Sequence, residues 1–150
     1  MSASAAKGRI LIVDDDENAV EILTRMLARE GYTSLAAQSG PEALRLLEQE
    51  SVDVILLDVM MPGMDGFAVC ERLRENDQWR EIPVILLTAR DDLESRARGM
   101  KLGVSEYLTK PVNRAELFAR IDTQLHAAAL TRKMSETAEA ISGKTKLPNA

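Results

Sequence analysis

The chain has 150 residues, of which 45% are hydrophobic and only 3% aromatic, so we expect a single domain with an aliphatic core. It carries 19 basic and 24 acidic residues, and the resulting net charge of −5 argues against nucleic-acid binding by the domain surface. The single cysteine, Cys70, cannot form an internal disulfide, and no apolar run is long enough to span a membrane. We therefore expect a cytoplasmic protein that contacts neither nucleic acid nor membrane.

Short apolar runs alternate along the chain with segments of helical periodicity. The expected strands cover residues 10–13, 33–37, 54–57, 84–87 and 106–108. The expected helices cover residues 19–27, 39–47, 66–74, 92–102 and 113–125, the fourth of them capped by Asp91 or Asp92. The strongest apolar runs are continuous rather than alternating, which indicates strands buried on both faces of a parallel sheet. The expected fold class is α/β, a flavodoxin-like doubly wound sheet of five parallel strands in the order 2-1-3-4-5, with five helices and an extended last helix.

Polar residues end several of the expected strands. They are Asp14, Asp15, Asp58, Thr88 and Lys110. Ligands of open parallel sheets bind at this edge, and three carboxylates gathered there require a cation, for which Mg²⁺ is well suited. A carboxylate beside a metal ion and a lysine favours phosphoryl transfer, with Asp58 as the nucleophile. In such a reaction Thr88 would donate its hydroxyl to one phosphoryl oxygen and Lys110 would pair with another.

At these residues the sequence resembles the receiver domain of bacterial two-component response regulators. The resemblance rests on four segments in the same order and spacing: ILIVDDD (10–16), VILLDVMMPGMDG (54–66), VILLTAR (84–90) and EYLTKP (106–111). It implies a phosphorylation-dependent switch that is not an enzyme beyond its own phosphotransfer and dephosphorylation. A sensor histidine kinase or a phosphotransfer protein would be its partner.

The resemblance also assigns roles to individual residues. Asp58 aligns with the phosphoacceptor, and Lys110 aligns with the functional lysine of the family. The resemblance also implies that the peptide bond between Lys110 and Pro111 is cis. Asp14 and Asp15 align with the acidic pair that organises Mg²⁺, and the backbone carbonyl of Met60 aligns with a further metal ligand.

Other aligned positions concern switching and the lifetime of the phosphoryl group. Thr88 and Tyr107 align with the switch pair, which implies that phosphorylation alters the face formed by the fourth helix, fifth strand and fifth helix. Met60 and Arg90 align with positions that modulate hydrolysis. We expect this face either to form a phosphorylation-dependent homodimer or to stay solvated.

Two other functions, and purely structural roles for single residues, are alternatives to this hypothesis. The spacing of Asp14 and Asp16 also fits a haloacid-dehalogenase-type phosphatase with an aspartate nucleophile, although that hypothesis leaves Asp58 unexplained. A receiver-like module that binds partners without phosphorylation is the second alternative. Taken singly, the aspartates near residue 15 would simply cap a helix, and Tyr107 would pack in the core or an interface.

The two ends of the chain differ from its centre. We expect residues 1–8 to be disordered, residues 9–126 to form the domain, and residues 127–150 to form a C-terminal helical extension and a disordered tail. The segment 127–150 has a charge of +2, whereas residues 1–126 have a charge of −7. Apolar and small residues with a spacing of 3 and 4 predict a helix that continues to about residue 141, followed by Ser142-Gly143 as the stop: Ala127, Leu130, Met134, Thr137 and Ile141.

Overall fold

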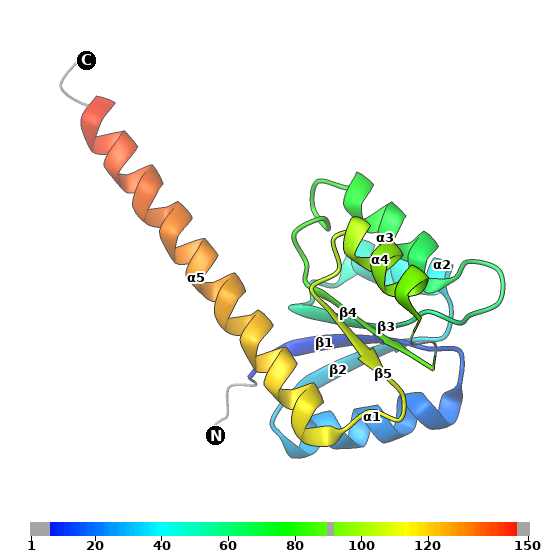
Figure 1. The fold of residues 1–150 in the computed structure, drawn as a ribbon. Coiled ribbons are helices and arrows are strands. Elements are labelled where there is room, and N and C mark those ends of the chain that lie inside the picture. The colour runs from blue at the N-terminus through cyan, green and yellow to red at the C-terminus, as the bar shows by residue number, and fades with distance from the viewer. Residues whose placement is uncertain (1–6, 90–91, 147–150) are drawn as a thin grey trace.

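The computed structural model describes residues 7–89 and 92–146, which form one α/β sandwich and a long projecting helix (Figure 1). The described residues contain five parallel strands in the order β2-β1-β3-β4-β5, as predicted. The strands are β1 (Arg9–Val13), β2 (Thr33–Ala37), β3 (Val54–Asp58), β4 (Val84–Thr88) and β5 (Glu106–Thr109). The helices are α1 (Glu17–Arg29), α2 (Gly40–Gln49), α3 (Gly66–Glu75), α4 (Leu93–Lys101) and α5 (Arg114–Lys146).

Two apolar clusters sit on opposite faces of the sheet because successive side chains of a strand point to opposite sides. In β1, Leu11 belongs to the cluster under α2 and α3, whereas Ile10 belongs to the cluster under α1 and α5. Figure 1 shows the same division of the helices between the two faces. The three central strands, β1, β3 and β4, are therefore buried on both sides, which explains their uninterrupted apolar sequences.

The helices begin where short polar side chains satisfy free backbone N–H groups. The carboxylate of Asp16 accepts a hydrogen bond from the N–H of Asn18 at the start of α1. Equivalent side-chain caps begin the next helices and are provided by Ser39 for α2, Asp65 for α3 and Asp92 for α4. These caps hold the first turn of each helix next to the carboxyl end of the preceding strand, where the candidate site lies.

Gly66 brings α3 unusually close to β3. A Cβ atom at this position would lie 2.5 Å from the carbonyl oxygen of Asp58, a distance that no side chain tolerates. The N–H of Gly66 donates to the carbonyl oxygen of Val59 at 3.0 Å, which closes the loop that follows the strand. The glycine thus fixes the backbone on which Asp58 is presented.

The ends of the domain differ in two respects from the sequence prediction. Lys7 and Gly8 were expected to be disordered, but Lys7 donates its N–H to Gly31 and Gly8 accepts from Thr33, which extends the pairing of β1 and β2. The expected helix end near residue 141 is wrong, because α5 continues to Lys146. Serine and glycine lower helix propensity by at most about 1 kcal/mol each, and neither prevents a helical backbone.

No helix within the described part of the chain is long and apolar enough to cross a membrane. Residues 1–6 and 147–150, where disorder was expected, lie outside the described residues.

Candidate functional site

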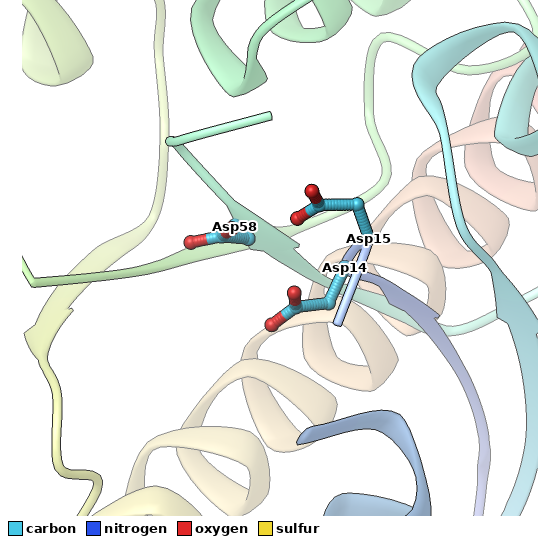
Figure 2. Close-up of side chains that lie close together, drawn as sticks. All are labelled: Asp14, Asp15 and Asp58. Atoms are coloured by element: carbon cyan, nitrogen blue, oxygen red, sulfur yellow. The ribbon is translucent and has the colours of Figure 1, made fainter. Parts of the chain in front are cut away.

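The candidate site lies at the carboxyl edge of the sheet, where β1 and β3 are neighbours. Val13 pairs with Leu57, so the next residues in each strand, Asp14 and Asp58, come side by side. Figure 2 shows their carboxylates together with that of Asp15 beyond the strand ends. One oxygen from each of the three carboxylates lies within 4.8 Å of the others. The predicted gathering of acidic residues at this edge is therefore found in the structure.

The three carboxylates differ in their environment. Asp14 and Asp58 are only 2% and 6% exposed, whereas Asp15 is open to solvent. The carboxylate of Asp14 accepts a hydrogen bond from the N–H of Asp16 at 3.0 Å. The site is therefore a buried pair of carboxylates with a third, accessible carboxylate at its mouth.

Lys110 is the positive charge of the site. It follows β5, and its Nζ lies 2.9 Å from Oδ2 of Asp14 and 3.4 Å from Oδ1 of Asp58. Its backbone N–H donates to the carbonyl oxygen of Thr88 at 2.7 Å, and the bond to Pro111 is cis, as the resemblance implies. One ammonium group against three carboxylates leaves an excess of two negative charges among these residues.

The protonation equilibria of the pair follow from this arrangement. Burial raises the pKa of Asp58 above its ordinary value, and the nearby charge of Asp14 raises it further, while Lys110 and the N–H of Met60 oppose these effects. Burial alone would lower the pKa of Lys110, but the hydrogen bond that its ammonium group donates to Asp14 and the charge of Asp58 outweigh this effect, so the pKa of Lys110 is raised. Lys110 is thus held in its charged form.

The donor set fits a magnesium ion. It consists of carboxylate oxygens only, lacks histidine and cysteine, and includes the solvent-open Asp15, which suits an ion that retains several water ligands. The excess of two negative charges matches a divalent cation. Met60 contributes its backbone at the same place, since its N–H bonds to the Asp58 carboxylate, while its side chain is 54% exposed.

The remaining predicted residues lie around this centre. Thr88 is fully buried at the end of β4, next to β3. Tyr107 lies on β5 beside Leu86, and its ring is covered by the guanidinium of Arg96 from α4, whose carbon is 4.8 Å from the ring centroid. Arg90, the second position expected to modulate hydrolysis, lies outside the described residues.

The contact of Arg96 with Tyr107 was not predictable from the sequence. Arg96 lies on the exposed side of α4, and only the packing of α4 against β5 brings it over Tyr107. No spacing or motif in the sequence indicates this contact. By contrast, Asp16 is present near the site but caps α1 instead of joining the carboxylate cluster, and this argues against the phosphatase interpretation based on Asp14 and Asp16.

Comparison with known proteins agrees with this geometry. Residues 10–122 match the family described as the response regulator receiver domain. The chain belongs to this family. The receiver domain is 48% identical over 113 residues to the response regulator PleD of Caulobacter vibrioides, an alignment that covers 75% of this chain and 25% of PleD. It is 40% identical over 128 residues to the alkaline phosphatase synthesis transcriptional regulatory protein PhoP of Bacillus subtilis, covering 85% of this chain and 52% of PhoP.

Solved structures show the same fold. The receiver domain of a signal transduction histidine kinase from Syntrophus aciditrophicus is 37% identical with a TM-score of 0.75, and the match covers 80% of this chain and 91% of that one. The chemotaxis protein CheY4 of Vibrio cholerae is 30% identical with a TM-score of 0.75, covering 81% of this chain and all of CheY4. The chain spans about a quarter to a half of the length of the two curated relatives named above.

Proposed function

We propose that this receiver domain is a phosphorylation-dependent switch in which Asp58 accepts a phosphoryl group in the presence of Mg²⁺. The observation that carries the proposal is the buried pair Asp14 and Asp58, bridged by Lys110 and flanked by the accessible Asp15. A phosphoryl-accepting site requires a nucleophilic carboxylate, a permanent positive charge, and carboxylate charge that the positive side chain does not fully neutralise.

The reaction follows from the positions of the side chains. An oxygen of Asp58 attacks the phosphorus of a phosphohistidine on a sensor kinase or phosphotransfer protein, the P–O bond forms, and the P–N bond breaks with its electrons returning to the imidazole. Lys110 pairs with one phosphoryl oxygen, and the hydroxyl of Thr88 donates to another. When bound by Asp14, Asp15, Asp58 and the carbonyl of Met60, Mg²⁺ would supply neutralisation of the charge on the phosphoryl oxygens.

The consequence of phosphorylation is proposed to pass through Thr88 and Tyr107. The hydroxyl of Thr88 moves toward the new phosphoryl oxygens, which makes room for Tyr107 to turn inward. The surface formed by α4, β5 and α5 then changes and becomes available for a second copy or an effector. The protein catalyses only its own phosphorylation and dephosphorylation, and we place it in the cytoplasm with its kinase.

Labelling with a small acyl phosphate tests the proposal. With Mg²⁺, the mass of the protein should rise by one phosphoryl group on Asp58, and chelation of the metal should abolish the change. Asp58→Asn should prevent labelling, while Asp122→Asn, an exposed carboxylate on α5, should leave it intact. Asp15→Asn should weaken metal binding first.

The alternatives predict different outcomes. Label found on Asp14 would favour the phosphatase hypothesis over a receiver switch. Undiminished labelling of Asp58→Asn would overturn the assignment of the phosphoacceptor. A protein that binds its partners equally well with Asp58 unphosphorylated or blocked would support a phosphorylation-independent module.

A further inference from the structure

We propose that a second copy of this chain packs along the outer side of α5 beyond the sandwich, so that the two helices form a short parallel coiled coil. The contact surface, called here the tail stripe, consists of Ala127, Leu130, Met134 and Thr137. These residues are separated by 3, 4 and 3 positions, and the sequence continues the pattern with an isoleucine at 141.

The tail stripe is apolar and open to solvent. Leu130 is 60% exposed and Met134 is 63% exposed, whereas Leu117 and Ile121, on the part of α5 that covers the sheet, are completely buried. Leu130 and Met134 lie on the same side of the helix and are mostly in contact with water. Burial of their apolar surface against a partner would be favourable.

The receiver itself does not cover the tail stripe. A groove of about 1130 Å³ separates the extension from the bottom of the sandwich, and its lining includes Ala128 and Thr131 on the helix side and Val52 and Pro83 on the domain side. Because successive helical residues are about 100° apart, Leu130 lies about 200° around the axis from Ala128. Ala127 also lines the groove and so forms the edge of the tail stripe, whereas Leu130 and Met134 do not line it. Beyond the sandwich, α5 projects freely from the domain (Figure 1).

The spacing indicates the kind of partner. An average repeat of 3.5 residues keeps a stripe in continuous contact only with another helix that supercoils with the same repeat. A second copy supplies that helix, and a twofold axis parallel to α5 places each residue of the tail stripe against its own equivalent. No like-charge pair opposes this arrangement, since the parallel register sets Lys133 near the alanine at 138 and His126 near Thr131.

The same register also shows where the contact begins. Toward the N-terminus of α5, the pattern of 3 and 4 continues through Thr123, Arg120 and Glu116, which are exposed but polar or charged. Apolar contact thus starts at Ala127, where the sandwich ends. Because most of the stability of helices in proteins comes from packing of an apolar side, pairing would also stabilise the extension itself. The inference does not depend on phosphorylation of Asp58.

Disulfide cross-linking of the full chain tests the proposal. Leu130→Cys puts a thiol on the tail stripe, and the control Ala129→Cys puts one on the adjacent exposed position, while the native Cys70 is completely buried. Under mild oxidation we expect Leu130→Cys to form covalent dimers at least tenfold faster than Ala129→Cys. Equal rates would indicate random collision and would overturn the proposal, as would the absence of dimer in both variants.

A second measurement avoids cysteine chemistry. In sedimentation equilibrium of the unmodified chain, the dimer fraction should rise with concentration and fall strongly in Leu130→Glu. Ala129→Glu adds the same charge one residue away and should leave the dimer fraction nearly unchanged. A dimer that both substitutions leave intact, or a wild-type chain that is monomeric throughout while Leu130→Cys cross-links no faster than its control, contradicts pairing through the tail stripe.

Discussion

The Nζ atom of Lys110 lies 2.9 Å from Oδ2 of Asp14 and forms its shortest ion pair there. The distance to the carboxylate of Asp58 is 0.5 Å longer, at 3.4 Å. In this structure the lysine therefore neutralises a proposed metal ligand at least as much as the proposed nucleophile. A metal ion and Lys110 then compete for the same carboxylate, and binding of the ion should release the ammonium group toward Asp58.

Replacing Lys110 with methionine should separate metal binding from phosphoryl transfer. Loss of the ammonium group removes a repelling charge from the metal site, so the affinity for Mg²⁺ should rise by up to about tenfold, given how strongly charges interact at short range near a protein surface. Labelling by an acyl phosphate should nevertheless slow. Titration calorimetry measures the affinity, with Lys101→Met, an exposed lysine of α4, as the control. Weaker Mg²⁺ binding in Lys110→Met would contradict the competition.

Asp58→Asn should stabilise the metal-free protein at neutral pH by about 1 kcal/mol, because it removes a buried carboxylate from the neighbourhood of Asp14. The pKa of Asp58 is raised on folding, so its ionisation opposes folding. The advantage of the variant should be absent below the ordinary carboxyl value of 3.8, grow as the pH rises from there to the raised pKa of Asp58, and stay constant above it.

Urea unfolding in a chelator over a range of pH measures this effect, and Asp122→Asn provides an exposed control. Added Mg²⁺ should reverse the order of stability, because wild-type protein binds the ion more tightly than the variant. A variant that is less stable than wild type without metal would show that the Asp58 charge is not a net cost to folding.

Met60→Asn should accelerate the release of phosphate from the phosphorylated protein several-fold. The methionine side chain is 54% exposed beside Asp58 and offers no strong hydrogen bond, whereas an amide can orient an attacking water molecule. Met100→Asn is a matched control, since Met100 is similarly exposed but lies on α4. Single-turnover phosphate release provides the rate, and an unchanged or slower release in Met60→Asn would count against this role.

Arg96→Ala should favour the inward position of Tyr107. The arginine covers the ring at 4.8 Å, and loss of an exposed cation–π contact worth about 0.5–1 kcal/mol corresponds to a two- to fivefold shift in the switch equilibrium. The apparent affinity for beryllofluoride, a stable phosphoryl mimic, should rise by the same factor. Lys101→Ala removes a positive charge from the same helix without touching the ring, and an equal effect of both substitutions would make the contact irrelevant.

The positions of Asp14, Asp58, Thr88 and Lys110 were predictable because each polar residue interrupts an apolar strand at the same edge of the sheet. The order of strands was predictable for a related reason, since continuous apolar runs and helical crossovers leave few parallel topologies. Helix starts followed from local hydrogen bonding, as at Ser39, whose hydroxyl accepts from the N–H of Glu42.

Features that depend on packing between distant elements were not predictable. Arg96 reaches Tyr107 only because α4 crosses β5, and Arg74 of α3 donates to the carbonyl oxygens of Leu102 and Gly103, 28 and 29 residues away. The preference of Lys110 for Asp14 depends on differences of half an ångström. The end of α5 was mispredicted because propensity makes Gly143 costly in a helix but does not forbid it.

The long last helix gives the molecule a mechanical property that the sandwich alone lacks. One end of α5 is clamped against the sheet by Leu117 and Ile121, and the part beyond Ala127 extends for about 30 Å at the usual rise per residue. The projecting part of α5 can therefore tilt as a rigid rod about the domain boundary. A tilt of about 5° at the domain boundary is too small to disturb the core, but it would displace the C-terminal end of the helix by about 3 Å. Such a displacement is enough to move that end from one side-chain contact to the next. Small rearrangements near β5 would therefore produce their largest displacement at the far end of α5.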